Sequence, residues 1–271
     1  MKFICHLSFM LALVSCTGKH IKREIKDPSW DAFSSESLIR MDDKRLKKAL
    51  TFKENAGCYQ GEIEKTLNKF KDTYAQKRND SYWLDIGTCY FLNDEYEKAE
   101  FYYRQALSES KNNSLKAVIL NNLGLVYVNF GLWDKAHDLF NQSISLETSF
   151  RVPRFNLALL YLQFGLFDKT ISLLSSNSFQ GLHDVDIYLN LASAYLFKGD
   201  FVKADEFFKL IPRESFKRED VAAVYSLLLF EKGNTLEAAK VLDQREKSNA
   251  ASFNLMTKKI EKLIALKLNK D

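Results

Sequence analysis

Reactive side chains are few in this sequence, with four cysteines and four histidines among 271 residues. His20, His137 and His183 have no spacing that is typical of a metal site. Carboxylates are numerous, but no pair is set apart for acid–base work. Neither a phosphate-binding glycine loop nor a serine-nucleophile motif occurs. The sequence therefore predicts no catalytic site and no metal site, and a protein that is not an enzyme.

Cys16 differs from the other cysteines because it follows a targeting signal. The apolar run Phe3–Val14 is preceded by one lysine; it is too short for a membrane span of about 20 residues and is typical of a secretory signal. The residues Leu13-Val14-Ser15-Cys16 resemble the bacterial lipobox. This resemblance implies a lipoprotein signal peptide over residues 1–15 and a covalent diacylglycerol and N-acyl lipid on Cys16, with no other cofactor.

The same resemblance implies a location. Thr17, rather than Asp, follows the cysteine, which in Gram-negative sorting favours the periplasmic face of the outer membrane. An ordinary signal peptide, or a partly buried N-terminal helix with an incidental cysteine, are the alternatives. Residues 16–37 would then hold the lipidated cysteine and a flexible tether. Its basic residues either contact acidic lipid headgroups or are simply solvated.

Composition favours long helices. Ten glycines and three prolines are too few for the regular turns of a β-sandwich or barrel. The 46% hydrophobic and 27% charged residues are ordinary for a globular protein. The 39 basic and 35 acidic residues give a net charge of +4, which is too evenly mixed to indicate a nucleic-acid binder.

A 34-residue period organises most of the chain. Gly131, Gly165, Gly199 and Gly233 lie 34 residues apart, and Asp94 fits the same slot in an earlier copy. A small residue lies seven positions before each of these slots: Gly87, Gly124, Ala158, Ala192 and Ser226. Five copies in one register indicate a repeat architecture.

This pattern resembles the tetratricopeptide repeat (TPR), with its aromatic–x₂–Leu–Gly–x₂–Tyr opening and its later alanine–x₃–aromatic motif. The resemblance implies an all-α fold, a right-handed α-solenoid of stacked helix–turn–helix units with a C-terminal capping helix. The 34-spaced glycine would end the first helix of each unit in a left-handed conformation. The small residue would let the second helix pack closely against the first.

The copies predict the domain organisation. We expect a degenerate TPR-like unit over residues 38–79, five TPR units over residues 80–247, and a capping helix over residues 248–271 with lysines on its outer face. Cys58 and Cys89 are an even pair for an oxidising compartment. They are either bridged, which would tie the degenerate unit to the first copy, or buried separately as two thiols.

The TPR resemblance also implies a binding groove, lined by the second, fifth, ninth and twelfth residues of each copy. Most of these side chains are apolar, which predicts a groove for an apolar or amphipathic segment of a partner. The candidate groove residues are Asn121, Leu125, Val128, Phe155, Leu159, Leu162, Leu189, Ser193, Leu196, Leu227 and Phe230. The alternative is that a tightly wound superhelix, or the C-terminal helix folding back, fills this groove.

Asn122, Asn156 and Asn190 occupy one slot in three successive copies. Because buried amides need hydrogen-bond partners, we expect a ladder between helices rather than ligand contacts. TPR proteins that bind chaperones hold a terminal carboxylate with lysines and asparagines. The required lysines are missing here, so that activity is not expected.

The sequence thus favours a membrane-anchored protein–protein interaction scaffold of the bacterial envelope. Its expected partner is another envelope protein or peptide segment, with no nucleic acid and no small-molecule substrate. Two alternatives stay open: an assembly factor for a secretin, similar to the type IV pilus pilotins, and a carrier of an apolar ligand.

Overall fold

The computed structural model describes residues 58, 63–74, 79–180, 184–246 and 251–268, with the backbone alone for residues 251–256 and 268. The predicted signal peptide, Cys16 and the tether lie outside the described residues. Most of the predicted degenerate unit lies outside them as well.

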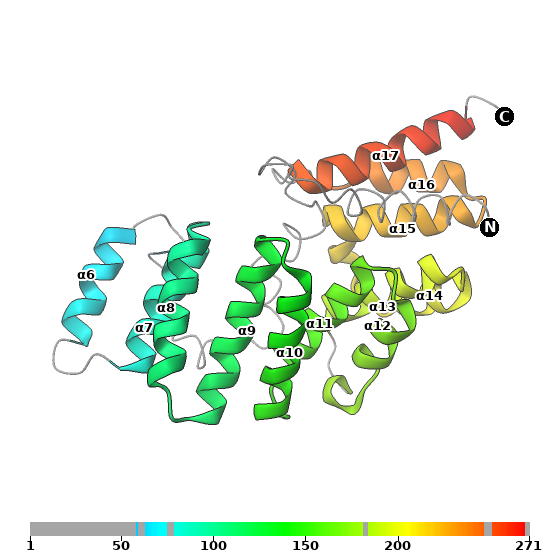
Figure 1. The fold of residues 1–271 in the computed structure, drawn as a ribbon. Helices are drawn as coiled ribbons and strands as arrows, with labels where there is room; N and C mark the ends of the chain where they lie inside the picture. The colour runs from blue at the N-terminus through cyan, green and yellow to red at the C-terminus, as the bar shows by residue number, and fades with distance from the viewer. Residues whose placement is uncertain (1–57, 59–62, 75–78, 181–183, 247–250, 269–271) are drawn as a thin grey trace. The chain divides into compact units, whose positions relative to one another are not determined.

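The described residues form α-helices and short 3₁₀ segments, and none of them is in a strand. Five helix pairs follow one another along the chain (Figure 1): α7 (Asp80–Leu92) with α8 (Tyr96–Glu109), α9 (Asn113–Asn129) with α10 (Trp133–Leu146), α11 (Val152–Gln163) with α12 (Phe167–Leu174), α13 (Val185–Lys198) with α14 (Phe201–Phe208), and α15 (Glu219–Glu231) with α16 (Thr235–Asp243). Helix α6 (Ile63–Thr73) precedes them and α17 (Ala251–Leu268) follows them. The 3₁₀ segments η1 (Asn177–Phe179) and η2 (Arg213–Lys217) come after α12 and α14.

The chain divides after Leu157, within α11, into two compact units. We call the described residues 58–157 the N-terminal unit and the described residues 158–268 the C-terminal unit.

Each helix pair turns at a residue in the left-handed conformation. The φ angles at the four 34-spaced glycines lie between 69° and 87°, and Asp94 has a φ of 60°. At the second pair, the Gly131 N–H donates to the Val128 carbonyl over 2.9 Å and the Leu132 N–H donates to the Tyr127 carbonyl over 2.8 Å. These two bonds close the helix end, and glycine is favoured there because a Cβ is strained at positive φ. The predicted helix-ending role of the repeating slot, Asp94 included, is confirmed.

The small residue of each first helix brings the second helix close. A Cβ added to Gly124 would lie 2.5 Å from the Phe140 ring, and one added to Gly87 would lie 2.6 Å from the Tyr103 ring. Both rings are fully buried. These close approaches explain why the slot excludes large side chains.

A disulfide joins Cys58 to Cys89, whose Cα atoms lie 5.1 Å apart. The Asn93 side-chain amide donates to the carbonyl oxygens of both cysteines, over 2.9 Å each. Of the two alternatives for these cysteines, the structure shows the bridge. It ties the segment before α6 to the first complete helix pair.

Helix α17 closes the C-terminal unit by packing against α15 and α16. Its Ile260 and Ile264 belong to the apolar core of this unit. Polar groups accompany this contact: Arg245 Nη2 donates to Glu261 over 2.9 Å, and the buried Glu219 accepts from the Thr257 hydroxyl over 3.2 Å. Arg245, Glu219 and Thr257 are almost fully buried, so removing one of them would leave a buried polar group unsatisfied.

We expect Gly124→Ala to lower the free energy of unfolding by about 1–2 kcal/mol, because the new methyl group overpacks against the Phe140 ring. Phe140→Leu should cost less stability in the Gly124→Ala background than in the wild type. Denaturant unfolding of the two single variants and the double variant measures this coupling. Additive effects would show that the ring moves aside without cost.

Candidate functional site

The first helices of the pairs carry all eleven candidate groove residues, and most of these side chains are buried. Eight are buried in the structure: Asn121, Val128, Phe155, Leu159, Leu189, Ser193, Leu196 and Leu227. Three are partly exposed: Leu125, Leu162 and Phe230. The partly exposed three are therefore the groove positions at which a partner could make contact without displacing core side chains.

In the C-terminal unit, several groove candidates belong to the apolar core. Leu189, Leu196 and Leu227 form one cluster with Ile260 and Ile264 of α17. Phe230 packs against the same cluster while keeping part of its surface exposed. These leucines are buried and help to hold the helices together. Their burial agrees with the alternative that the protein's own side chains fill the groove.

An amide chain crosses from α9 to α11 in the N-terminal unit. Asn156 Nδ2 donates to Asn121 Oδ1 over 2.7 Å, and Asn121 Nδ2 donates to Asn122 Oδ1 over 3.2 Å. The inter-helix contact thus runs through Asn121, which the sequence placed in the groove lining. Asn156 Oδ1 is buried and accepts no hydrogen bond, so one acceptor in this chain is unsatisfied.

Asn190 departs from the predicted ladder. Its side-chain amide donates to the Asp186 carbonyl of its own helix over 2.7 Å. Ser193, a groove candidate one turn further on, likewise donates to the Leu189 carbonyl over 2.7 Å. Both side chains satisfy their donors within α13, because the backbone carbonyl four residues earlier is the nearest acceptor.

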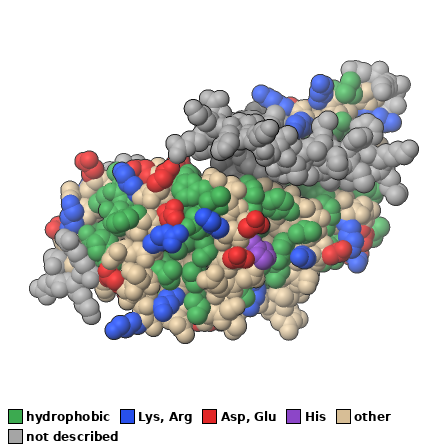
Figure 2. Space-filling model, in the orientation of Figure 1, with side chains coloured by type: hydrophobic (Ala, Val, Ile, Leu, Met, Phe, Trp, Pro, Cys, Tyr) green, Lys and Arg blue, Asp and Glu red, His purple; other side chains and the backbone are tan. Residues whose placement is uncertain are grey.

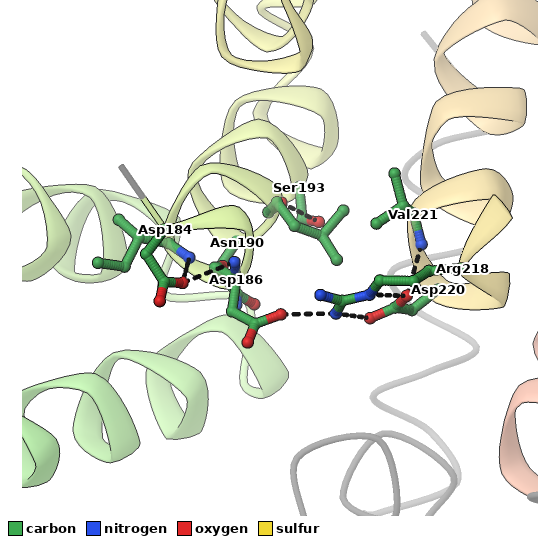
Figure 3. A network of polar contacts seen from close by, with 9 residues as sticks. Asp184, Asp186, Asn190, Ser193, Arg218, Asp220 and Val221 are labelled. Atoms are coloured by element: carbon green, nitrogen blue, oxygen red, sulfur yellow. Dashed lines mark hydrogen bonds and ion pairs between the residues drawn. The ribbon is translucent and has the colours of Figure 1, made fainter. Parts of the chain in front are cut away.

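A charged network that the sequence reasoning missed links α13 to the start of α15 (Figure 3). The Arg218 guanidinium donates to Asp220 through Nε (3.1 Å) and Nη2 (2.6 Å), and Nη2 also lies 2.6 Å from Asp186 Oδ1. The Asp186 side chain is 5% exposed and that of Arg218 is 27% exposed. Asp186 and Asp220 stand at the second residue of the copies that begin at residues 185 and 219, a position expected to line the groove. Nothing in the sequence marks Arg218 as their partner.

The carboxyl of Asp184 caps α13 in this network. Its Oδ1 accepts from the backbone N–H groups of Asp186 (2.8 Å) and Ile187 (3.2 Å). Burial, followed by the charge of Asp186, nevertheless raises the pKa of Asp184 above its usual value. Burial by itself would lower the pKa of the Arg218 guanidinium. The contacts with Asp220 and Asp186 outweigh burial and raise this pKa above its ordinary range.

This network can hold two helices in register, and the partly exposed guanidinium can contact a partner. Two carboxylates, those of Asp186 and Asp220, contact the one guanidinium. Among the residues that the structure describes, no group of three or more histidine, cysteine, aspartate or glutamate side chains is placed to hold a metal ion.

Asp184→Asn should leave the protein as stable as the wild type or more stable at neutral pH, because asparagine keeps the helix cap and removes a desolvated charge. The folded-state pKa of Asp184 is raised, so the wild type gains stability as the pH falls through that pKa, and the advantage of the variant should shrink. Thermal unfolding at several pH values measures this. Asp184→Ala, which loses the cap, is the control and should cost about 1 kcal/mol.

Two sequence models described as tetratricopeptide repeat match the chain, one over residues 79–148 and the other over residues 185–211. These two segments are tetratricopeptide repeats. They contain helices α7 to α10 and the pair α13 and α14. The comparison with curated proteins found no match.

Solved structures share the fold. A tetratricopeptide repeat protein from Parabacteroides merdae is 16% identical, with a TM-score of 0.56 over 86% of this chain and 96% of that one. The MamA RS-1 ArsTM double mutant is 14% identical, with a TM-score of 0.52 over 68% of this chain and 94% of that one. The predicted fold class is confirmed: this is an all-α solenoid of TPR units. None of its described helices combines the length and the apolar character that crossing a membrane requires.

Proposed function

We propose that this protein is a lipid-anchored adaptor of the bacterial envelope that binds a partner protein through the first helices of its repeats. The observation that carries the proposal is the contact between first helices of successive repeats within each unit, α7 with α9 and α13 with α15. Neighbouring first helices in repeat proteins form binding surfaces. The three partly exposed groove candidates, Leu125, Leu162 and Phe230, supply apolar contact area on first helices.

The disulfide supports an extracytoplasmic location. Cys58 and Cys89 are bridged, and disulfides persist in oxidising compartments such as the bacterial periplasm. This agrees with the lipobox-like residues that end at Cys16 and with the expected position on the periplasmic face of the outer membrane. Two or more acyl chains on Cys16 would make a stable anchor, because one chain alone binds a bilayer only weakly.

The partner expected from the surface is an envelope protein segment with apolar side chains. A pilotin-like role in secretin assembly is one specific form of this adaptor function. The carrier alternative is disfavoured because the side chains that would line its cavity are mostly buried among one another.

Cys16→Ala should release the protein from the membrane fraction, because the variant has no thiol to which the diacylglycerol can be attached. Labelling with radioactive palmitate and alkaline extraction of membranes measure the change. Cys58→Ala with Cys89→Ala is the matched control and should keep both the label and the membrane association. A wild type that takes up no label would contradict the anchor.

Leu125→Glu and Phe230→Glu, tested one at a time, should each weaken partner binding about tenfold or more, because the partner would bury an unpaired carboxylate. Both side chains are partly exposed, so helicity measured by circular dichroism should be unchanged. Quantitative copurification after envelope crosslinking measures binding and identifies the partner.

Val202→Glu is the control for this pair, because Val202 is 72% exposed on α14, a second helix of a repeat. Equal loss of binding in the control, or full binding by both groove variants, would contradict the proposed surface.

A further inference from the structure

The outer face of α17 carries a set of lysines that make no ion pair. Lys258, Lys259 and Lys262 are exposed, and none of them forms a salt bridge or hydrogen bond among the described residues. Figure 2 shows basic side chains over the region of α17, in the upper right of the view. These three lysines and Leu266, which is 51% exposed, are called the basic face of α17 below.

The helical repeat places these residues together. At about 100° per residue, Lys258, Lys259, Lys262 and Leu266 fall within about a quarter of the helix circumference. The buried residues Thr257, Ile260 and Ile264 fall on the opposite side. The basic face is therefore one surface, directed away from the core of the C-terminal unit.

The need for a polar cap does not by itself explain why the charges on this face are positive. A terminal helix needs only a polar exterior, which mixed charges provide as well as lysines do. The acidic side chain of α17 nearest to this face, Glu261, is engaged by Arg245 at 2.9 Å and does not neutralise the lysines. Elsewhere in the C-terminal unit, Lys198 pairs with Asp168 and Lys240 with Glu237. Lys169 and Lys203 lie over the rings of Tyr161 and Tyr195 instead.

We propose that the basic face of α17 lies against an anionic phospholipid bilayer. Lysine ammonium groups complement phosphate headgroups, and Leu266 can enter the interface between headgroups and acyl chains. Such a contact strengthens partitioning about fivefold for each lysine, or about 100-fold for three, and it weakens as salt screens the charges. The inference uses the proposed lipid anchor only to bring the protein to a bilayer. It adds a second contact that would orient the repeats relative to the membrane.

A fluorescent probe next to the basic face tests the contact. Ala265→Cys, exposed on α17 and labelled with bimane, is purified as the full chain and mixed with vesicles that contain brominated phosphatidylcholine, with or without phosphatidylglycerol. We expect bromine quenching in the vesicles with phosphatidylglycerol, and its loss in high salt. In the triple variant, all three lysines are replaced by glutamine (Lys258→Gln, Lys259→Gln and Lys262→Gln). This variant should partition to the vesicles about 100-fold more weakly and show no quenching.

Two controls complete the experiment. Bimane at Val202→Cys, on α14, should not respond to the lipid composition. Circular dichroism should show the same helicity for the triple variant, since the three lysines are exposed and form no hydrogen bond or ion pair with another described residue. Equal quenching in vesicles without phosphatidylglycerol, or quenching that survives the triple substitution, would overturn the proposal.

Vesicle flotation of the same samples in high salt reports the lipid anchor separately. Protein that floats in high salt but shows no quenching under any condition retains its anchor and refutes the basic-face contact. Protein that does not float in high salt, yet is quenched by phosphatidylglycerol vesicles in low salt, supports the contact and refutes the anchor.

Discussion

The close contact between the two helices of each repeat is the constraint on which the rest of this structure depends. At Gly87 and Gly124 the backbone of the first helix lies so near an aromatic ring of the second that a methyl group would overlap it. A left-handed residue then ends the first helix and starts the turn. Close packing and a sharp turn together set the 34-residue period, and each pair leaves apolar surface that only a neighbouring pair can bury.

In a protein built from such repeats, the same first helices must form the core and offer side chains to a partner. The first helix of a pair packs against its own partner helix and against neighbouring pairs, so few of its side chains remain accessible. Leu189 and Leu227 stand at groove positions and yet belong to the core. Leu125 and Phe230 keep part of their surface exposed, and partner recognition is therefore expected to concentrate at such positions.

Some buried polar groups in this packing lower the stability of the fold. The Asn121–Asn122–Asn156 chain leaves a buried acceptor on Asn156 unsatisfied. The Arg218 guanidinium contacts the carboxylates of Asp186 and Asp220. Burial raises the pKa of the neighbouring Asp184, because it disfavours the charged form. Such features cost stability in isolation.

The amino-acid sequence alone determined the local structure of this protein. It predicted the helix pairs and their period, the left-handed residue at each turn, Asp94 included, and a capping helix with lysines on one side. These follow from contacts and torsions within some forty neighbouring residues, which leave a periodic signal. Only the tertiary structure decided that Cys58 and Cys89 are bridged, that most candidate groove residues are buried, and that Arg218 joins Asp186 to Asp220. Burial and charge pairing depend on which side chains meet across helices, and residues 32 positions apart, such as Asp186 and Arg218, leave no period that reveals their contact.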